Sequence, residues 1–165
     1  MHIRRPDIFL LLLLTLMLQF AMGCSSSAQS IQGERWVIFP GEQAQEQGIG
    51  SWFVEDGPTA EYWSPSENNI LILEKQLGAY LQNNSDRFDK QKSPIGERLD
   101  EYDRQYTGMV LGEKKIIFAN YFCESLETDW RTEFVFVLDG GDCFFQFKYD
   151  VNSGEFFDLQ VNGIA

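Results

Sequence analysis

The longest regular pattern in the chain is an apolar stripe within residues 64–82. Apolar side chains recur there at spacings of three and four, which is the period of one face of an α-helix. We expect this helix to end near Gln82, where an Asn-rich stretch follows, and to carry Glu74 and Lys75 away from its buried face. The stripe consists of Ile70, Leu73, Leu77, Tyr80 and Leu81.

The residues before the stripe predict where the helix begins. Ser64 can cap the first turn, and Pro65 suits the first helical position because it has no N–H to leave unpaired. Glu67, three residues after Ser64, completes the pattern of a capping box. The sequence therefore predicts that Ser64 is the N-cap.

From Arg104 onward, apolar and polar residues alternate with a period of two, which is typical of β-strands. Gly112-Glu113 has the composition of a two-residue hairpin loop, and Asp139-Gly-Gly-Asp142 that of a tight turn that needs positive φ angles. We therefore expect consecutive hairpins. The predicted strands are 105–111, 114–123, 132–138, 143–149 and 155–161.

The stretch before the helix is rich in aromatic residues. It predicts a short strand at 36–39, a polar loop at 42–50 and a second short strand at 51–54. The rings either pack on the core or form a flat ligand platform for a carbohydrate or peptide. The platform candidates are Trp36, Trp52, Phe53, Tyr62 and Trp63.

The order of these elements predicts an α+β fold in which one amphipathic helix packs on a four- to five-stranded antiparallel β-meander. That order resembles the cystatin-like architecture, which implies a curved sheet wrapped around a helix. Cystatins inhibit cysteine proteases through a Gln-Val-Val-Ala-Gly-type hairpin and a Pro-Trp turn. Here Gln105-Tyr-Thr-Gly108 is one residue too short and Asp139-Gly-Gly-Asp142 contains no Pro-Trp, so the inhibitory residues do not carry over.

Three short motifs also resemble those of small, uncharacterised exported bacterial proteins. They are Gln105-Tyr-Thr-Gly, Leu138-Asp-Gly-Gly and Val161-Asn-Gly. The likeness covers residues 60–165 and implies an exported domain without implying a reaction.

The N-terminus has the pattern of a targeting signal. Arg4 and Arg5 precede an apolar run from Ile8 to Ala21, which is shorter than the roughly 20 residues that a spanning helix needs. Ala21-Met22-Gly23-Cys24 then resembles the lipobox of bacterial lipoprotein precursors, although Ala21 replaces the usual Leu. The resemblance implies that Cys24 is acylated and becomes the new N-terminus; ordinary secretion, with cleavage after Ala28, is the alternative.

These patterns divide the chain into a lipoprotein signal peptide (1–23), a flexible Ser/Gln-rich tether (24–34), an aromatic-rich extension (35–63) and an α+β domain (64–165). The whole chain has a net charge of −12, with 13 basic and 25 acidic side chains. Such a charge repels nucleic acid and anionic headgroups, so we expect a membrane partner only through the lipid and otherwise a neutral or cationic partner.

The composition argues against most catalytic chemistry. The one histidine is His2, inside the signal peptide, so the mature chain has no histidine base, no catalytic dyad with histidine and no histidine ligand for zinc. We expect no cofactor and no metal. A hydrolase that uses two carboxylates, as in glycosidases, is the catalytic alternative.

Cys123 and Cys143 are the two cysteines after Cys24, and exported chains usually pair such residues. In the predicted meander, however, Cys123 ends one strand and Cys143 begins the next strand but one. Strands of about 20 Å would then separate two Cα atoms that a disulfide needs within about 7 Å. This topology disfavours a disulfide.

Two further candidates have ordinary structural interpretations beside functional ones. Asp139 and Asp142 could bind calcium, but aspartate is also favoured in turns. Arg104 could fix an anionic ligand or pair with a carboxylate. We expect an envelope lipoprotein, facing the periplasm or the cell exterior, whose domain binds a protein or peptide. The alternatives are a carboxylate-dependent hydrolase, a carbohydrate binder and, by fold analogy alone, a protease inhibitor.

Overall fold

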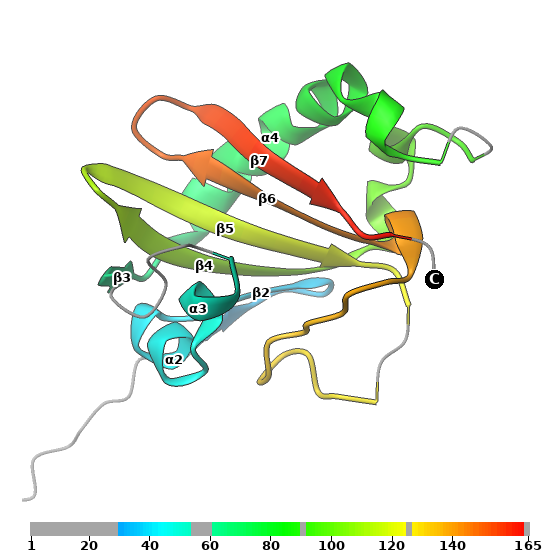
Figure 1. The fold of residues 1–165 in the computed structure, drawn as a ribbon. Coiled ribbons are helices and arrows are strands. Elements are labelled where there is room, and N and C mark those ends of the chain that lie inside the picture. Colours follow the sequence, from blue (N-terminus) through cyan, green and yellow to red (C-terminus); the bar gives the residue numbers. More distant parts are fainter. Residues whose placement is uncertain (1–29, 54–60, 90–91, 125–126, 164–165) are drawn as a thin grey trace, which may run out of the picture.

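The computed structural model describes residues 30–53, 61–89, 92–124 and 127–163. The predicted signal peptide, Cys24 and most of the predicted tether lie outside this part of the chain. The described residues form an α+β fold around one seven-stranded sheet (Figure 1). The strands are β1 (Ile31–Gln32), β2 (Trp36–Ile38), β3 (Glu61–Trp63), β4 (Asp103–Leu111), β5 (Lys114–Phe122), β6 (Phe144–Asp150) and β7 (Glu155–Val161). The α-helices are α2 (Gly41–Glu46), α3 (Ile49–Phe53) and α4 (Glu67–Asn83), and short 3-10 turns lie at Ser85–Arg87, Ile95–Glu97, Leu99–Glu101 and Gly141–Cys143.

The sheet is mostly antiparallel but mixed. Its strand order is β1-β2-β4-β5-β6-β7, and β3 pairs with a second stretch of the β4 edge. β2 runs parallel to β4, with Trp36 opposite Arg104, whereas β3 runs antiparallel, with Trp63 opposite Gly108. The predicted extension at 35–63 is therefore built into the sheet. The prediction of a purely antiparallel meander was wrong because it gave β2 no place beside β4.

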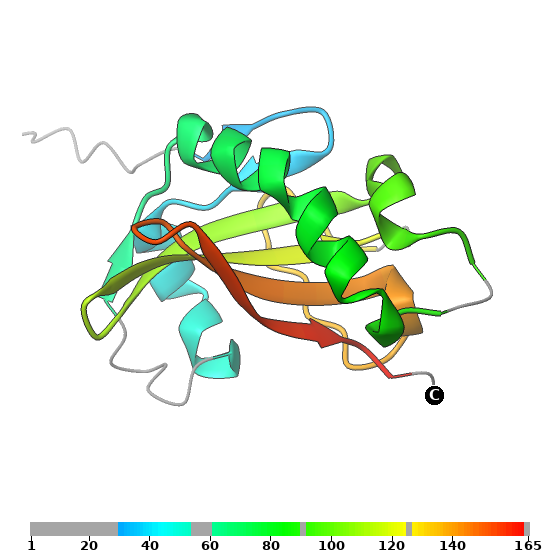
Figure 2. The ribbon, with the colours of Figure 1, turned by 90° about the horizontal axis from the view of Figure 1, so that it is seen from above.

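Helix α4 crosses one face of the sheet (Figure 2). The predicted stripe is confirmed for Ile70, Leu73, Leu77 and Leu81, which are all buried, while Tyr80 is half-buried. Together with ring-bearing residues of β4, β5 and β6, they form the larger core. Transfer of such side chains from water is the main stabilising term for this layer.

The helix begins two residues later than predicted. Ser66 is the N-cap: its side chain accepts a hydrogen bond from Asn69 N, and the Asn69 side chain accepts one from Ser66 N. The predicted cap, Ser64, instead accepts a hydrogen bond from the N–H of Gly41 at 3.0 Å, which ties the start of α2 to β3. Glu67 is the first helical residue and not the capping partner.

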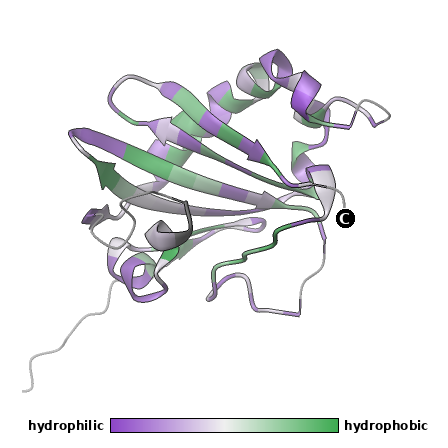
Figure 3. Ribbon diagram, viewed as in Figure 1, coloured by the Kyte–Doolittle hydropathy of each residue, from purple (hydrophilic) through white to green (hydrophobic). Residues whose placement is uncertain are grey.

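The opposite face of the sheet is covered by α2, α3 and the segment 127–143, and Figure 3 shows apolar residues in the strands and in this segment. The loop predicted at 42–50 and the strand predicted at 51–54 were wrong, because the helices α2 and α3 occupy 41–46 and 49–53; Val54 lies outside the described residues. Buried Ala44 and Ile49 pack there with Val37, Phe39 and Phe118 in a second core. Periods of two and of 3.6 cannot be separated over so few residues.

The hairpin prediction at Gly112 is confirmed: its φ is 60°, and it joins β4 to β5. The part of the chain that the structure describes contains no helix that is both long enough and apolar enough to cross a membrane.

Thr107 leads to the first stability prediction. Its side chain is fully buried in β4, and its Oγ1 has no hydrogen-bond partner among the described residues. A buried hydroxyl without a partner costs free energy, so the near-isosteric Thr107→Val should raise the free energy of unfolding by about 1 kcal/mol. Urea denaturation measures this; a destabilised variant would mean that an internal water satisfies the hydroxyl.

Asp150 leads to a pH prediction. Burial would raise the pKa of its carboxyl, but hydrogen bonds from the backbone N–H of Asn152 (2.9 Å) and Ser153 (3.4 Å), with Lys114 at 3.7 Å, lower the pKa overall. A lowered folded pKa adds stability above the unfolded pKa of about 3.9, and that stability is lost as pH falls through the folded pKa. The loss of stability between pH 5 and pH 3 should therefore be shallower in Asp150→Asn. Equal slopes for the two proteins would contradict this assignment.

Candidate functional site

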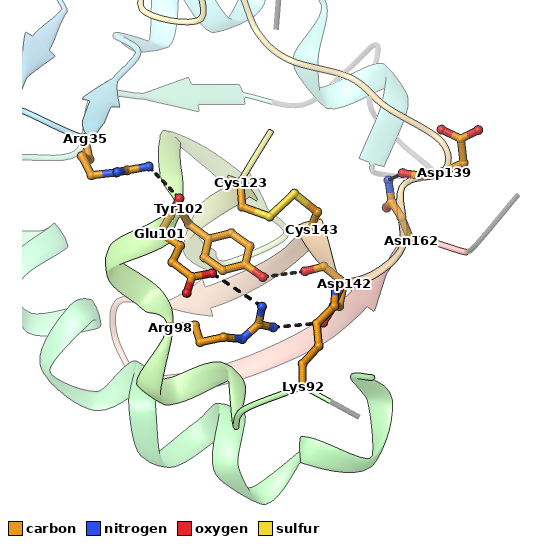
Figure 4. Close-up of a disulfide and its surroundings, with 10 residues drawn as sticks. All are labelled: Arg35, Lys92, Arg98, Glu101, Tyr102, Cys123, Asp139, Asp142, Cys143 and Asn162. Carbon is orange, nitrogen blue, oxygen red and sulfur yellow. Dashed lines mark hydrogen bonds and ion pairs between the residues drawn. A yellow bond between two sulfur atoms is a disulfide. The ribbon is translucent and has the colours of Figure 1, made fainter. Parts of the chain in front are cut away.

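A disulfide joins Cys123 to Cys143 where β5 ends and β6 begins (Figure 4). β5 and β6 are direct antiparallel neighbours, with Phe122 opposite Phe144, so the two cysteines lie side by side with Cα atoms 5.1 Å apart. The Cys123 N–H also donates to the Cys143 carbonyl at 3.0 Å. The prediction against a disulfide was therefore wrong, because the strand placed at 132–138 does not exist.

The chain leaves the sheet after β5 and returns to it at the start of β6. We call residues 124–142 the excursion; the structure describes 124 and 127–142 of it. Its middle part is extended but makes no strand pairing, and it crosses the face of the sheet opposite α4. Val135 points into the sheet and is buried, whereas Phe136 and Leu138 are 41% and 79% exposed.

Buried amide side chains hold the excursion on the sheet. Gln105 Nε2 donates to the carbonyls of Trp130 (2.6 Å) and Glu133 (2.8 Å), and its Oε1 accepts from Val135 N (2.9 Å). Asn120, opposite Gln105 in the β4–β5 ladder, donates to the Val135 carbonyl at 2.9 Å. These bonds satisfy backbone groups that a neighbouring strand would otherwise satisfy.

The excursion ends in an ion-pair cluster around a buried carboxylate. Asp142 is almost fully buried, and its two carboxylate oxygens contact Lys92 Nζ at 2.6 Å and Arg98 Nη2 at 3.0 Å, whereas the Lys92 side chain is half-exposed. The hydroxyl of Tyr102 donates to the Asp142 carbonyl at 2.8 Å (Figure 4). Gly140 and Gly141 have φ angles of 91° and 62°, so the predicted need for positive φ is confirmed, but the turn leads into β6 and does not join two strands.

The environment keeps Tyr102 a hydrogen-bond donor. Burial raises the pKa of its hydroxyl to about 12, although nearby Arg98 lowers the pKa in part. The hydroxyl therefore stays protonated to a higher pH than that of an ordinary tyrosine, and its hydrogen bond links the 3-10 turn at Leu99–Glu101 to the end of the excursion.

Two surface cavities lie beside the cluster and share Val161 and Asn162. The larger, about 860 Å³, runs from Arg87 to Asp142, and the smaller, about 300 Å³, lies against the exposed residues of the excursion. Asn162 Nδ2 donates to the carbonyls of Val137 (2.6 Å) and Asp139 (3.0 Å) and so fixes their shared wall. We call the two together the groove. The larger cavity is lined by Arg87, Phe88, Asp89, Lys92, Asp139, Gly140, Gly141, Asp142, Val161 and Asn162, and the smaller by Phe136, Val137, Leu138, Gln146, Gln160, Val161, Asn162 and Gly163.

A second polar cluster lies between α4 and the sheet, and sequence reasoning missed it. Glu74 Oε1 accepts short hydrogen bonds from the hydroxyls of Tyr106 and Tyr121, which lie 2.8 Å apart, and Arg104 NH1 is 3.7 Å from Glu74 Oε2. The expectation that Glu74 points away from the core was wrong, whereas the expected pairing of Arg104 with a carboxylate is confirmed. Burial raises the pKa of both tyrosines well above the ordinary value. Both rings are fully buried, so this cluster is structural.

The predicted aromatic platform is not one surface. Trp36 and Trp63 pack against the core under α4, whereas Tyr62 packs against the core on the other face, where its hydroxyl accepts from Gly50 N at 2.8 Å. The backbones of Trp52 and Phe53 belong to α3, and their side chains lie outside the described part. The structure therefore gives the described rings packing roles.

Comparisons with known proteins identified no relative of this chain. No protein-family model matches this chain, and searches of curated proteins and of solved structures found no match. Within residues 30–53, 61–89, 92–124 and 127–163, no three His, Cys, Asp or Glu side chains gather to hold a metal ion. The function therefore has to be argued from the groove and from the sequence.

Proposed function

We propose that this chain is an exported lipoprotein, anchored in a membrane of the cell envelope through Cys24, whose α+β domain binds a protein or peptide partner. One observation carries the binding part: the two exposed apolar side chains of the excursion, Phe136 and Leu138, stand beside the groove. Exposed apolar groups at a cavity are typical of a surface that a partner covers.

The disulfide supports the exported part of the proposal. Cys123 and Cys143 are the two cysteines after Cys24, and they are paired. Structural disulfides persist in oxidising compartments and are rare in the cytosol. The signal pattern and the disulfide are independent features of the chain, and both favour the envelope.

We also propose that the arrangement of α4 and β4–β7 is cystatin-like. The helix precedes four consecutive antiparallel strands and lies across one of their faces. The proposal concerns architecture alone, because the inhibitory hairpin residues of cystatins have no counterpart here. It therefore does not favour protease inhibition.

Metabolic labelling with a fatty-acid analogue tests the anchor. The wild-type chain should take up the label, and Cys24→Ala should not. Equal labelling of the two, or no labelling of the wild type, would contradict lipidation.

The binding part is tested by capture from a detergent extract of envelopes, with Leu138→Ser as the binding variant and Leu71→Ser as the matched control. Leu71 is 60% exposed on the outer surface of α4, so both substitutions remove an exposed leucine.

A further inference from the structure

We propose that the groove binds an extended protein segment in which apolar side chains alternate with basic ones. The inference rests on the proposed binding function and specifies its site and the chemistry of the partner. It is carried by the apolar wall of the smaller cavity, the exposed Asp139 carboxylate of the larger one with the net charge of the chain, and the position of both cavities in the sheet.

The apolar wall is a built feature of the fold. Leu138 is 79% exposed although its neighbours are fixed, since Asn162 holds the backbone carbonyls on both sides of it, at Val137 and Asp139. A side chain held out to solvent on an anchored backbone loses little further entropy when a partner covers it. The smaller cavity, about 300 Å³, therefore fits one apolar side chain of an extended segment, with Phe136 and Leu138 as its wall.

The charges around the larger cavity balance once Arg98 is included. Its lining carries three carboxylates, those of Asp89, Asp139 and Asp142, against the cations of Arg87 and Lys92. Asp142 is neutralised by Lys92 and by Arg98 behind it, and Arg87 donates to the Leu159 carbonyl at 2.5 Å.

Asp139 lines the larger cavity, and its side chain is exposed. None of the ion pairs among the described residues involves Asp139, and Figure 4 shows its carboxylate turned away from the other labelled side chains. The chain as a whole has a net charge of −12. The exposed Asp139 carboxylate and the overall charge therefore favour a basic partner and speed its approach.

The groove lies on the side of the sheet away from the proposed membrane anchor, where a partner in the surrounding compartment can reach it. β1 and β7 are the two ends of the sheet order, and the groove lies along β6, β7 and the excursion. The chain enters the sheet at Ile31, a few residues after the proposed anchor, so the tether at that point spans at most about 25 Å. The groove is at the opposite edge from this entry point.

Fluorescence anisotropy with two labelled hexapeptides tests the inference. One peptide alternates leucine with lysine and the other alternates leucine with glutamate; six extended residues span about 20 Å. We expect the full chain, in neutral detergent, to bind the lysine peptide at least tenfold more tightly than the glutamate peptide. Leu138→Ser should weaken binding of the lysine peptide about tenfold, Asp139→Asn about threefold with a smaller dependence on salt, and Leu71→Ser should leave it unchanged.

Three results would overturn the inference: equal binding of the two peptides, equal losses in Leu71→Ser and Leu138→Ser, or no binding of the lysine peptide at millimolar concentration. All three substituted side chains are exposed, so thermal unfolding should show that the variants fold like the wild type. The envelope capture separates this inference from the proposed function. A partner recovered equally by wild type and Leu138→Ser would remove the groove and leave a binding protein, whereas no recovery by the wild type would remove the binding function itself.

Discussion

Replacing both Cys123 and Cys143 by serine is expected to lower the free energy of unfolding by about 3 kcal/mol. The disulfide closes a loop across a sequence separation of 20 residues, and without it the unfolded chain gains conformational freedom. The excursion would keep its amide hydrogen bonds but lose the link that fixes both of its ends. Urea denaturation of the double variant and the wild type measures the difference.

The matched control is Cys24→Ser, which removes a cysteine outside the disulfide. It should leave the free energy of unfolding unchanged. Reduction of the wild type with a dithiol should reproduce the loss seen in the double variant, and peptide binding should weaken in parallel because the wall of the groove is part of the excursion. A double variant as stable as the wild type, or reactive thiols at both positions in unfolded, unreduced protein, would contradict the bond.

Glu74→Ala is expected to lower the free energy of unfolding by about 2–4 kcal/mol. The variant removes the acceptor shared by the hydroxyls of Tyr106 and Tyr121, and it removes the carboxylate that faces Arg104. Both tyrosines are fully buried, so their hydroxyls cannot turn to water. Chemical denaturation measures the loss.

Lys75→Ala is the matched control, since Lys75 is the next residue of α4 and is exposed. It should change stability little. The combination of Glu74→Leu with Tyr106→Phe and Tyr121→Phe should recover part of the loss, because it removes the unpaired groups together with their acceptor. Equal losses in Glu74→Ala and Lys75→Ala would show that the cluster contributes nothing.

Local periodicity predicted the elements whose burial repeats regularly. The α4 stripe and four of the five strands predicted from Gln105 onward are present. In each of them, the side chains that face a core recur with the regular period of a helix or a strand. Sequence reasoning failed at 132–138, where the alternation is real but the partners are not strands. There Gln105, Asn120 and Asn162 supply the hydrogen bonds, and they come from positions remote in the sequence.

The wrong prediction of a strand at 132–138 also explains why the disulfide was disfavoured. With an extra strand predicted between β5 and β6, Cys143 was expected at the opposite end of the sheet from Cys123. The two cysteines were therefore expected to lie too far apart for a disulfide. The signal-peptide pattern was the better signal, because exported chains usually pair their cysteines. Glu74 was misplaced for a related reason: it lies beside the apolar stripe, and only the tertiary packing brings two tyrosine hydroxyls to it.

The groove itself had partial signals in the sequence. Asp139 and Asp142 were candidates for calcium binding, yet the structure turns one outward and buries the other between two cations. Nothing local marked Leu138 as exposed, because the alternation at 132–138 is that of a paired strand. Its exposure follows from the course of the excursion.

The most direct test of the account is photo-crosslinking in living cells with a photoreactive amino acid at position 138, compared with the same amino acid at position 71. We predict a discrete crosslinked protein from position 138 that is absent from position 71 and is lost on reduction of the disulfide. No adduct from position 138, or the same adducts from both positions, would contradict a binding surface at the groove.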